Sequence, residues 1–308
     1  MHQGIYHVPV MLQQVIEGLK VNPSGVYVDC TFGGGGHSKA ILDKLNEKGK
    51  LIAFDQDEEA KKNLPDDARI IFVSQNFRHL QKFLRLHKIT EVDGILADLG
   101  VSSHQFDKPG RGFSTRFNAN MDMRMDQRQK LMAMDVLKSY NEERLHKIFE
   151  QYGEVTNAKT LARLIVHNRN TITMQTIDDF KNAVHSIVKG NPNKYFAQVF
   201  QALRIEVNDE FNALKEMLLQ CVPLLKANGR VAIITFHSLE DRIVKNFFKN
   251  GLEDVITDEV YGIKNENPLY LITKKPIIPG EEELKQNPRA RSAKLRVAEK
   301  KNLNKIDQ

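Results

Sequence analysis

The sequence predicts an α/β fold, a doubly wound parallel sheet with a helical domain inserted into it. Short apolar runs that end in carboxylates or other polar residues alternate with helical stretches through the first third of the chain. Such runs are typical of parallel strands that helices cover on both faces. A long helical stretch without strand patterns follows, and strand patterns return near the C-terminus. This order indicates that one domain interrupts another.

The first part of the sheet is predicted from four apolar runs. They lie at 26–29, 51–54, 70–73 and 94–97, and a helix is expected over 39–45. The pattern changes after residue 103, where polar and Met-rich stretches begin.

Helical patterns dominate the middle of the chain. Amphipathic helices are predicted over 141–151, 158–167 and 176–188. Apolar residues between 196 and 218 fall at helical spacing and indicate a helix that packs in the core.

Strand patterns resume after a turn signal that ends at Gly229, with strands expected over 230–236 and 269–273. We therefore expect three segments. They are the first part of the core at 1–104, an inserted helical substrate-recognition domain at 105–195, and the second part of the core at 196–308, which ends in a basic tail.

Composition narrows the class of protein. Hydrophobic residues make up 41% and charged residues 27%, the balance of an ordinary globular protein. Cys30 and Cys221 are the only cysteines, which leaves neither a disulfide framework nor a cysteine zinc site, and no metal is expected. The sequence has no apolar run of membrane-spanning length and no signal-peptide pattern at its start. These features favour a cytoplasmic protein, and the net charge of +6 weakly favours a polyanionic partner.

Polar residues follow the predicted strands where ligands bind in open α/β sheets, outside the carboxyl ends. Gly33 to Gly36 allow a tight turn and a close approach of the backbone to a ligand. Asp55 is placed to accept hydrogen bonds from ribose hydroxyls, although a helix cap is its alternative role. Phe77 is placed to lie against an adenine, or else packs in the core. Asp98 ends the fourth strand, beside the expected reacting end of the cofactor.

This arrangement fits NAD or S-adenosylmethionine. The glycines do not satisfy the G-x-G-x-x-G spacing, because His37 and Ser38 follow them. Asp29 precedes the glycine loop, where it would repel a phosphate but suit a cationic amino acid or a sulfonium. The residues therefore favour S-adenosylmethionine.

Nine stretches, in order along the chain, carry a more specific resemblance. They are His7-Val-Pro-Val10, Asp29-Cys-Thr-Phe-Gly-Gly-Gly-Gly-His-Ser38, Asp93-Gly-Ile-Leu-Ala-Asp-Leu-Gly-Val-Ser-Ser103, Arg111-Gly-Phe-Ser114, Met121-Asp-Met-Arg-Met-Asp126, Tyr152-Gly-Glu154, Phe200-Gln-Ala-Leu-Arg-Ile205, Phe236-His-Ser-Leu-Glu-Asp-Arg242 and Asn287-Pro-Arg-Ala-Arg-Ser-Ala-Lys-Leu-Arg296. With them the sequence resembles the small-subunit ribosomal RNA methyltransferase H (MraW) family over nearly its whole length. It departs from the family pattern at 114–120 and 194–198, in or beside the insert.

The resemblance implies a class I, Rossmann-like methyltransferase sheet with a helical domain inserted after the fourth strand. It implies S-adenosylmethionine-dependent N4-methylation of a cytidine in the decoding region of 16S rRNA, within the small ribosomal subunit. The cofactor contacts that it implies are Gly35, Gly36, His37, Asp55, Phe77, Asp98 and Gln105. The prediction that Gln105 contacts the cofactor depends on the resemblance alone.

The proposed chemistry needs an acceptor for the exocyclic amine of cytosine, because the lone pair of this nitrogen is delocalised into the ring. Asp98 is the candidate catalytic residue, as an acceptor for the amine or for the reacting end of the cofactor. Many amino-methyltransferases carry Asp/Asn-Pro-Pro-aromatic at this point, whereas this chain has Asp98-Leu-Gly-Val101.

Several residues are candidates for contact with RNA. His237 follows the fifth strand, where a substrate contact and a capped helix start are the two interpretations, and a Ser/His hydrolase is disfavoured. Arg124 is expected either to bind phosphate or to form a buried ion pair that joins the insert to the core. The segment 287–296 is alternatively a solvated tail. The cations expected to engage phosphates are Arg111, Arg116, Arg289, Arg291, Lys294 and Arg296.

Three alternatives are left open. A nicotinamide-dependent oxidoreductase would use the same type of sheet, but the glycine spacing argues against it. A non-catalytic assembly factor that binds RNA would retain the cofactor pocket without turnover. A methyltransferase for a small molecule or a protein would not need the long insert and the basic segment. The sequence does not determine the oligomeric state.

Overall fold

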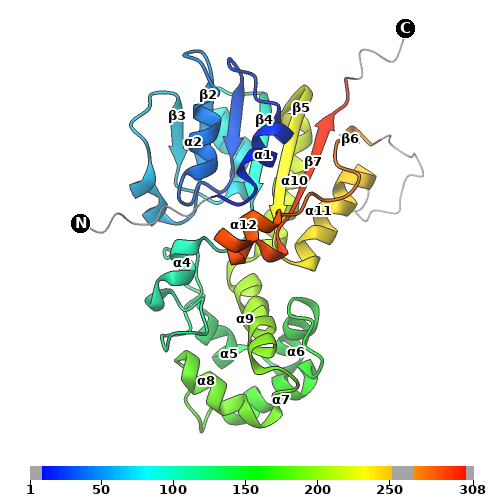
Figure 1. Cartoon of the computed structure of the whole chain (residues 1–308). Coiled ribbons are helices and arrows are strands. Elements are labelled where there is room, and N and C mark those ends of the chain that lie inside the picture. Colours follow the sequence, from blue (N-terminus) through cyan, green and yellow to red (C-terminus); the bar gives the residue numbers. More distant parts are fainter. Residues whose placement is uncertain (1–8, 252–266, 303–308) are drawn as a thin grey trace. The chain divides into compact units, whose positions relative to one another are not determined.

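The computed structural model describes residues 9–251 and 267–302, so the first resemblance motif, at 7–10, lies partly outside the described residues. The chain divides into two compact units (Figure 1). The sheet unit comprises residues 1–100 and 212–308, and the helical unit comprises residues 101–211. The predicted insert was 105–195. The helical unit extends further because the helix α9 (Pro192–Asn208) places Val199, Leu203 and other side chains in its core.

The sheet unit contains seven strands in the order β3-β2-β1-β4-β5-β7-β6. The strands β1 to β5 pair in parallel, and β7 runs antiparallel to both β5 and β6. This confirms the predicted α/β fold class, and the four N-terminal strands lie where the apolar runs predict them. Their bounds are β1 Val26–Asp29, β2 Lys50–Phe54, β3 Ile70–Val73, β4 Val92–Asp98, β5 Leu225–Thr235, β6 Leu269–Leu271 and β7 Lys294–Lys300.

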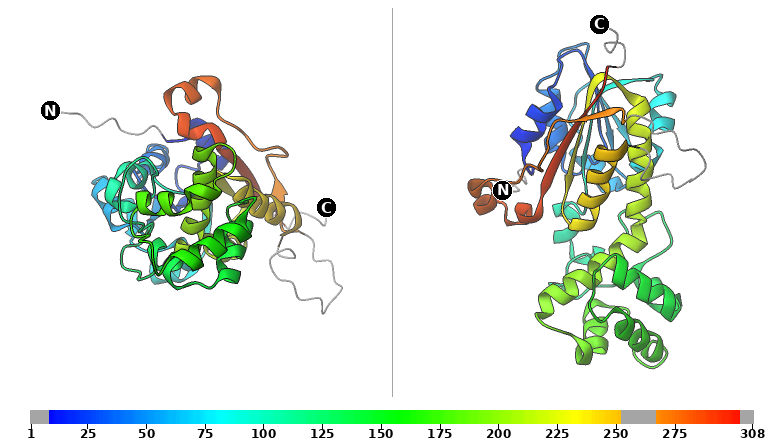
Figure 2. Two further views of the ribbon diagram at one scale, coloured as in Figure 1. Left: turned by 90° about the horizontal axis from the view of Figure 1, so that it is seen from below. Right: turned by 90° about the vertical axis from the view of Figure 1, so that its right-hand side faces the viewer.

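Helices cover both faces of the sheet (Figure 2). The helices α1 (Leu12–Leu19) and α2 (Gly36–Leu42) pack on one face, where Val15 and Ile41 are fully buried. The other face is covered by α3 (Leu80–Leu86), α10 (Glu210–Leu224) and α11 (Ser238–Asn250). The helix α2 begins three residues earlier than the predicted 39–45, directly after the glycine loop.

The segment 287–296 is part of the fold. It forms a 3₁₀ turn, η6 (Pro288–Ser292), and the first residues of β7, which pairs with β5. Leu295 and Val297 are fully buried. The alternative of a solvated, weakly ordered tail is therefore wrong, because backbone pairing and apolar burial hold this segment in the sheet.

The helical unit packs its helices around one apolar core. They are α4 Ser103–Asp107, α5 Ala133–Ser139, α6 Glu142–Gln151, α7 Ala158–Asn168, α8 Ile177–Val184 and α9 Pro192–Asn208. The third predicted helix ends at Val184 rather than 188, and a 3₁₀ turn follows. The helix predicted from the apolar pattern at 196–218 is two helices, because Asp209 adopts a left-handed conformation (φ 49°) between α9 and α10. Among the described residues, no helix is long and apolar enough to cross a membrane.

Candidate functional site

The candidate site lies at the carboxyl ends of the parallel strands in the sheet unit. Because β1, β2, β4 and β5 are parallel neighbours or near neighbours, the residues that end them meet at one edge of the sheet. Asp29 ends β1, Asp55 follows β2, Asp98 ends β4 and His237 follows β5. The sheet reverses its strand order between β1 and β4, where open α/β sheets bind ligands.

The glycine loop is shaped by steric demands. Gly35 has φ 76°, in the left-handed region, and a Cβ atom there would lie 2.9 Å from the Phe32 ring. A Cβ atom on Gly36 would overlap Pro9 Cγ. Glycine is therefore required at both positions, and α2 begins at once behind the loop. The exposed backbone of such a loop is suited to a close approach by a ligand.

Asp55 supports the glycine loop from the end of β2. Its Oδ2 accepts a hydrogen bond from the Gly33 amide (2.7 Å), and its Oδ1 accepts one from the Asp57 amide (2.8 Å). Burial raises the pKa of Asp55 to about 6, although both amide bonds oppose that rise. Asp57, rather than Asp55, is the helix cap: its side chain accepts a hydrogen bond from the Glu59 amide at the start of η1 (Glu58–Asn63).

Asp98 differs from Asp55 in its hydrogen bonding. Its backbone amide donates to Thr31 Oγ1 (2.7 Å), but its carboxylate accepts no hydrogen bond from any described residue. Oδ1 is enclosed by protein, whereas Oδ2 lies 3.7 Å from His37 Nδ1 and the side chain is 24% exposed. Burial raises the pKa of Asp98 to about 6; His37 opposes that rise and the charges of Asp29 and Glu240 reinforce it. A carboxylate in this state is a strong acceptor for a donor that reaches Oδ2.

His37 is held by the backbone of the N-terminal segment. Its Nε2 lies 2.9 Å from the Val10 carbonyl, to which the Nε2–H donates. In the neutral ring, Nδ1 then carries the lone pair and faces Asp98. The ring is 6% exposed, so its orientation is fixed by the protein.

Asp29 is buried and already has its own donors. Ser38 Oγ donates to its Oδ2 (2.7 Å) and the Thr31 amide donates to its Oδ1 (3.0 Å), and the residue is 1% exposed. Burial raises the pKa of Asp29 above its ordinary value. Asp29 therefore influences the site through its charge and through the two residues that it orients, rather than by contact with a ligand.

Phe77 is partly buried at the start of the turn η2 (Phe77–His79) and packs against the core of the sheet unit. The residue before it, Asn76, caps this turn and donates to Gln56 Oε1 (2.7 Å). This bond links the residues that follow β2 and β3. The contact of Phe77 with an adenine stays a prediction.

The residues after β5 form a capped helix start. His237 Nδ1 accepts from the Glu240 amide (3.3 Å), and Glu240 Oε2 accepts from the Phe236 amide (2.9 Å). Glu240 is 3% exposed, and its Oε1 lies 3.1 Å from His237 Nε2. The sequence places Glu240 on the same rim as His237, after the fifth strand, where a capped helix start and a substrate contact are the two interpretations. The spacing of a helix cap and a glutamate three residues later is the signal that identifies it.

The four candidate phosphate-binding residues of the segment 287–296 fall into two groups. Arg296 is 6% exposed and holds Asp241 through two hydrogen bonds (2.7 and 3.1 Å), while Lys294 lies 3.4 Å from the same carboxylate. These two cations are engaged in the fold. Arg291 is exposed and Arg289 is partly exposed, so these two are the ones presented to solvent.

The remaining predicted residues belong to the helical unit. Gln105 is 5% exposed and forms a reciprocal cap with Ser102 at the start of α4. Arg111 is 2% exposed and donates to the carbonyls of Arg124 and Met125. Because its guanidinium is buried, it is not accessible to a phosphate, contrary to the prediction.

Arg116 and Arg124 have different surroundings. The Arg116 guanidinium lies 5.4 Å from the centre of the Phe106 ring. Arg124 forms a bidentate ion pair with Asp122 (both bonds 2.7 Å). Since both partners lie in the helical unit, this ion pair stabilises the insert and does not join it to the core.

Within residues 9–251 and 267–302, no group of three or more His, Cys, Asp or Glu side chains is arranged to hold a metal ion.

Comparison with known proteins gives a consistent result. A family model described as the MraW methylase family matches residues 4–301. The ribosomal RNA small subunit methyltransferase H of Bacteroides fragilis (strain YCH46) is 50% identical over 298 residues, which cover 96% of this chain and 98% of that protein. The proteins of the same name from Azobacteroides pseudotrichonymphae and Flavobacterium johnsoniae are each 51% identical over 297 residues. These cover 96% of this chain and 97% and 98% of the two proteins, respectively.

Proposed function

The chain belongs to the MraW methylase family, and on that premise we propose that it methylates the N4 amino group of one cytidine in the decoding region of 16S rRNA. It is a methyltransferase that uses S-adenosylmethionine, and small-subunit ribosomal RNA is its substrate class. We also propose that the enzyme methylates the rRNA within the small ribosomal subunit, and that it acts in the cytoplasm.

The observation that carries the proposal is the state of Asp98. Its carboxylate is desolvated and accepts no hydrogen bond from the described residues, and Oδ2 is on its accessible side. An exocyclic amine offers two N–H donors, and an acceptor such as this one orients the nitrogen lone pair by binding one of them. Orientation of this kind contributes on the order of 7–11 kcal/mol to catalysis in favourable systems.

The residues at the strand ends fit the cofactor. The loop leaves room for the amino acid part at Gly34, where a Cβ atom would meet nothing within 4 Å, and Asp55 retains acceptor capacity for two ribose hydroxyls. The negative charges of Asp29 and Asp98 suit a cation. When bound, S-adenosylmethionine would supply a methyl group on a positively charged sulfur; the N–C bond would form as the C–S bond breaks, and the sulfur would keep the electron pair as a neutral thioether.

In the proposed mechanism Asp98 has two roles. Its Oδ2 first holds an N–H of the amine and then takes the proton that the nitrogen releases once it is methylated. A pKa of about 6 leaves Asp98 mostly ionised at neutral pH and still basic enough to share that proton. His37, fixed by the Val10 carbonyl, faces the same carboxylate and opposes the rise of the Asp98 pKa.

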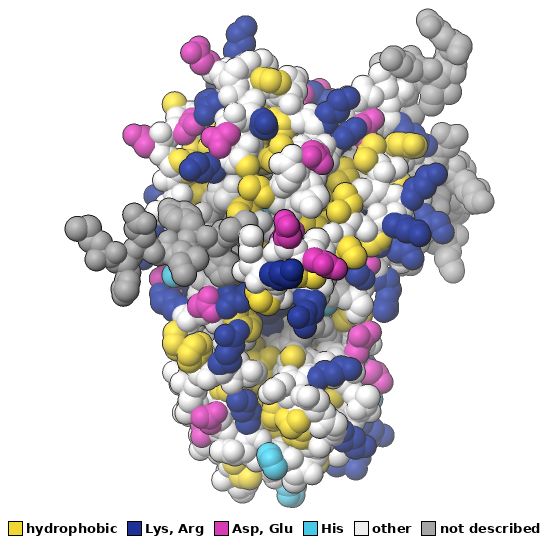
Figure 3. Space-filling model, in the orientation of Figure 1, with side chains coloured by type: hydrophobic (Ala, Val, Ile, Leu, Met, Phe, Trp, Pro, Cys, Tyr) yellow, Lys and Arg dark blue, Asp and Glu magenta, His cyan; other side chains and the backbone are white. Residues whose placement is uncertain are grey.

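We propose that the helical unit recognises RNA. Arg116 over the Phe106 ring, with Phe117 38% exposed beside it in sequence, combines a cation with aromatic faces as single-strand binding surfaces do. Lys and Arg side chains gather on the visible face of this unit (Figure 3). In the sheet unit, Arg289 and Arg291 are the proposed phosphate contacts, and His237 remains a proposed substrate contact. The target cytosine must leave any stack, which costs a few kcal/mol and least in single strands.

The test is transfer of labelled methyl from S-adenosylmethionine to small ribosomal subunits that lack the modification, followed by mass spectrometry of the digested nucleosides. We expect label in N4-methylated cytidine at a single position, and labelling about 10²- to 10⁴-fold slower with the Asp98→Asn variant. If the protein binds the cofactor but transfers no methyl to subunits or to free rRNA, the proposal is wrong. A different substrate or a non-catalytic assembly role would then account for the fold.

A further inference from the structure

A short N-terminal strap, defined here as Pro9, Val10 and Met11, lies against the glycine loop of the sheet unit. Pro9 occupies the space that a Cβ atom on Gly36 would need. The Val10 carbonyl accepts the hydrogen bond from His37 Nε2 (2.9 Å). Two consecutive residues of the strap therefore contact two consecutive residues at the start of α2, Gly36 and His37. The strap thus borders the proposed cofactor site.

The strap is held from its other side by a residue far away in the sequence. Glu283 Oε1 accepts a hydrogen bond from the Met11 amide (2.7 Å), across 272 residues of chain. Glu283 lies on the short helix α12 (Glu281–Gln286), which packs Leu284 against the same apolar cluster as α1. Met11 is 1% exposed and adopts φ 50°, a left-handed conformation that is uncommon for a residue with a side chain. An external partner is therefore needed to hold the strap in this conformation.

We propose that Glu283 is a positioning residue for the cofactor site. By holding Met11 it fixes the strap, and through the Val10 carbonyl it fixes the ring of His37 toward Asp98. The inference rests on the proposed function, because it assigns an effect on cofactor binding to a residue outside the strand ends.

The chain of contacts explains why the effect reaches the site. The Val10 carbonyl determines which ring nitrogen of His37 carries the proton, so that Nδ1 faces Asp98 Oδ2 at 3.7 Å. Without the bond at Met11, the strap is free to move away from Gly36, and the ring of His37 loses its only fixed acceptor at Nε2 among the described residues. Both changes alter the surface that the cofactor meets.

A purely structural role for Glu283 makes a different prediction. Met11 precedes α1, and no side chain of the helix start caps that helix. If Glu283 served only to complete the helix start, its loss would lower the melting temperature and leave cofactor affinity unchanged. The test must therefore measure both quantities.

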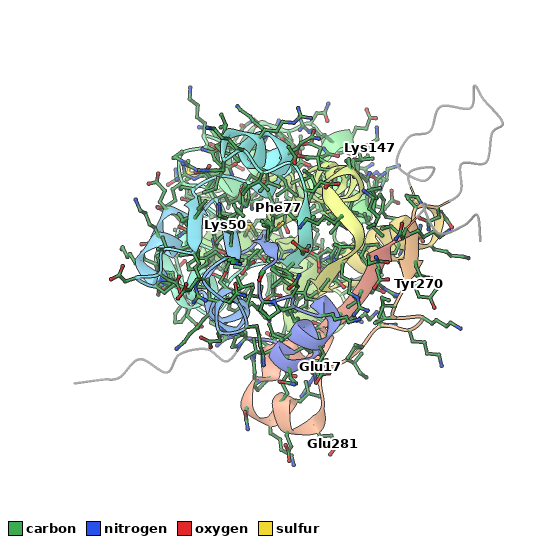
Figure 4. The ribbon with its side chains drawn as sticks, turned by 90° about the horizontal axis from the view of Figure 1, so that it is seen from above. Glu17, Lys50, Phe77, Lys147, Tyr270 and Glu281 are labelled. Atoms are coloured by element: carbon green, nitrogen blue, oxygen red, sulfur yellow. The ribbon has the colours of Figure 1, made fainter. Side chains whose placement is uncertain are left out.

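The experiment compares Glu283→Ala, Glu283→Gln and the control Glu281→Ala in the full chain. Glu281 lies on the same helix, is exposed, and sits at its outer end (Figure 4). Isothermal titration with S-adenosylmethionine and with S-adenosylhomocysteine gives the dissociation constants, and thermal unfolding gives the melting temperature. We expect Glu283→Ala to bind about tenfold more weakly, equivalent to about 1.4 kcal/mol. Glu283→Gln keeps an oxygen acceptor and is expected, like the control, to bind as the wild type does.

A double-mutant cycle with His37→Ala tests the route of the effect. If Glu283 acts through the strap and His37, Glu283→Ala has a smaller effect on affinity once the His37 ring is absent. An unchanged affinity of Glu283→Ala, or an undiminished effect in the His37→Ala background, would overturn the inference. Failure of the wild type to bind either ligand would instead overturn the proposed function, and this inference with it.

Discussion

The ends of β2 and β4 each carry an aspartate whose pKa is raised by burial to about 6, but the two are bonded differently. Asp55 accepts hydrogen bonds from the amides of Gly33 and Asp57, whereas the carboxylate of Asp98 accepts none from the described residues. Leaving a buried acceptor without a donor is costly to the fold. The difference fits the proposed function, in which Asp55 supports the loop that receives the cofactor and Asp98 is available to a group that arrives from outside.

The comparison predicts its largest effect at Asp98. In Asp98→Asn, the amide cannot take a proton and presents N–H donors toward the amine, so kcat should fall by about 10²- to 10⁴-fold, the range for loss of a general base. Steady-state methylation of small subunits at saturating cofactor measures this. Because Asn lacks the negative charge that suits the cationic cofactor, affinity for S-adenosylmethionine should also fall, as titration would show, and saturating cofactor separates that loss from the loss of turnover. Full turnover would remove Asp98 from the mechanism.

Asp55→Asn should affect mainly stability and cofactor affinity, whereas Asp98→Asn affects mainly kcat. An amide has one oxygen, so it cannot accept from both Gly33 and Asp57, and one backbone amide loses its partner. The free energy of unfolding should fall by about 1–3 kcal/mol, and cofactor affinity should fall as the loop loosens. Denaturant unfolding and titration calorimetry measure the two effects. If Asp55→Asn reduced kcat but left affinity and stability intact, the distinction between the two aspartates would fail.

The glycine loop allows a matched pair of substitutions. In Gly36→Ala the new methyl group overlaps Pro9, so Pro9 or the loop must shift, at a cost of about 1–3 kcal/mol in stability. Gly34→Ala places its methyl group where no atom lies within 4 Å and should be close to neutral in stability. Thermal unfolding of both variants, with cofactor titration, tests whether the loop depends on its contact with the strap. Equal effects would show that the loop is insensitive to that contact.

The sequence predicts the sheet well because its signals are local. Apolar runs such as 26–29 and 70–73 need no distant partner to be identified as buried strands, and β1 and β3 lie at those residues. Polar residues that follow such strands are then expected at one edge, as Asp55 and Asp98 are. Whether those aspartates have donors depends on the path of the loops around them, which local patterns do not encode.

Long-range contacts account for the features that the sequence did not predict. The break at Asp209 is stabilised by Asn208, whose side chain bonds the backbone of Met123 and Met125, more than eighty residues earlier in the chain. Arg111 looks like a phosphate ligand in the sequence, but carbonyls of a neighbouring loop bind it. The basic segment becomes a strand only because β5 pairs with it. A cation or a helical pattern in isolation does not reveal such partners.

The smallest effect predicted by the comparison is on the pH dependence of stability. The pKa of Asp98 is about 6 in the folded protein and about 3.9 in an unfolded chain. The folded state therefore binds the proton more tightly, so this group favours folding below pH 4, and that contribution is lost as pH rises through 6. Asp98→Asn removes the free-energy cost of keeping this desolvated carboxylate ionised at neutral pH. Because the side chain is 24% exposed, we expect the variant to gain about 1–2 kcal/mol relative to the wild type between pH 4 and pH 7. Denaturant unfolding of both proteins at several pH values measures the difference, in which the contribution of Asp55 cancels because both proteins retain it. Parallel curves for the two proteins would mean that Asp98 has an ordinary pKa and is not the desolvated acceptor that the mechanism needs.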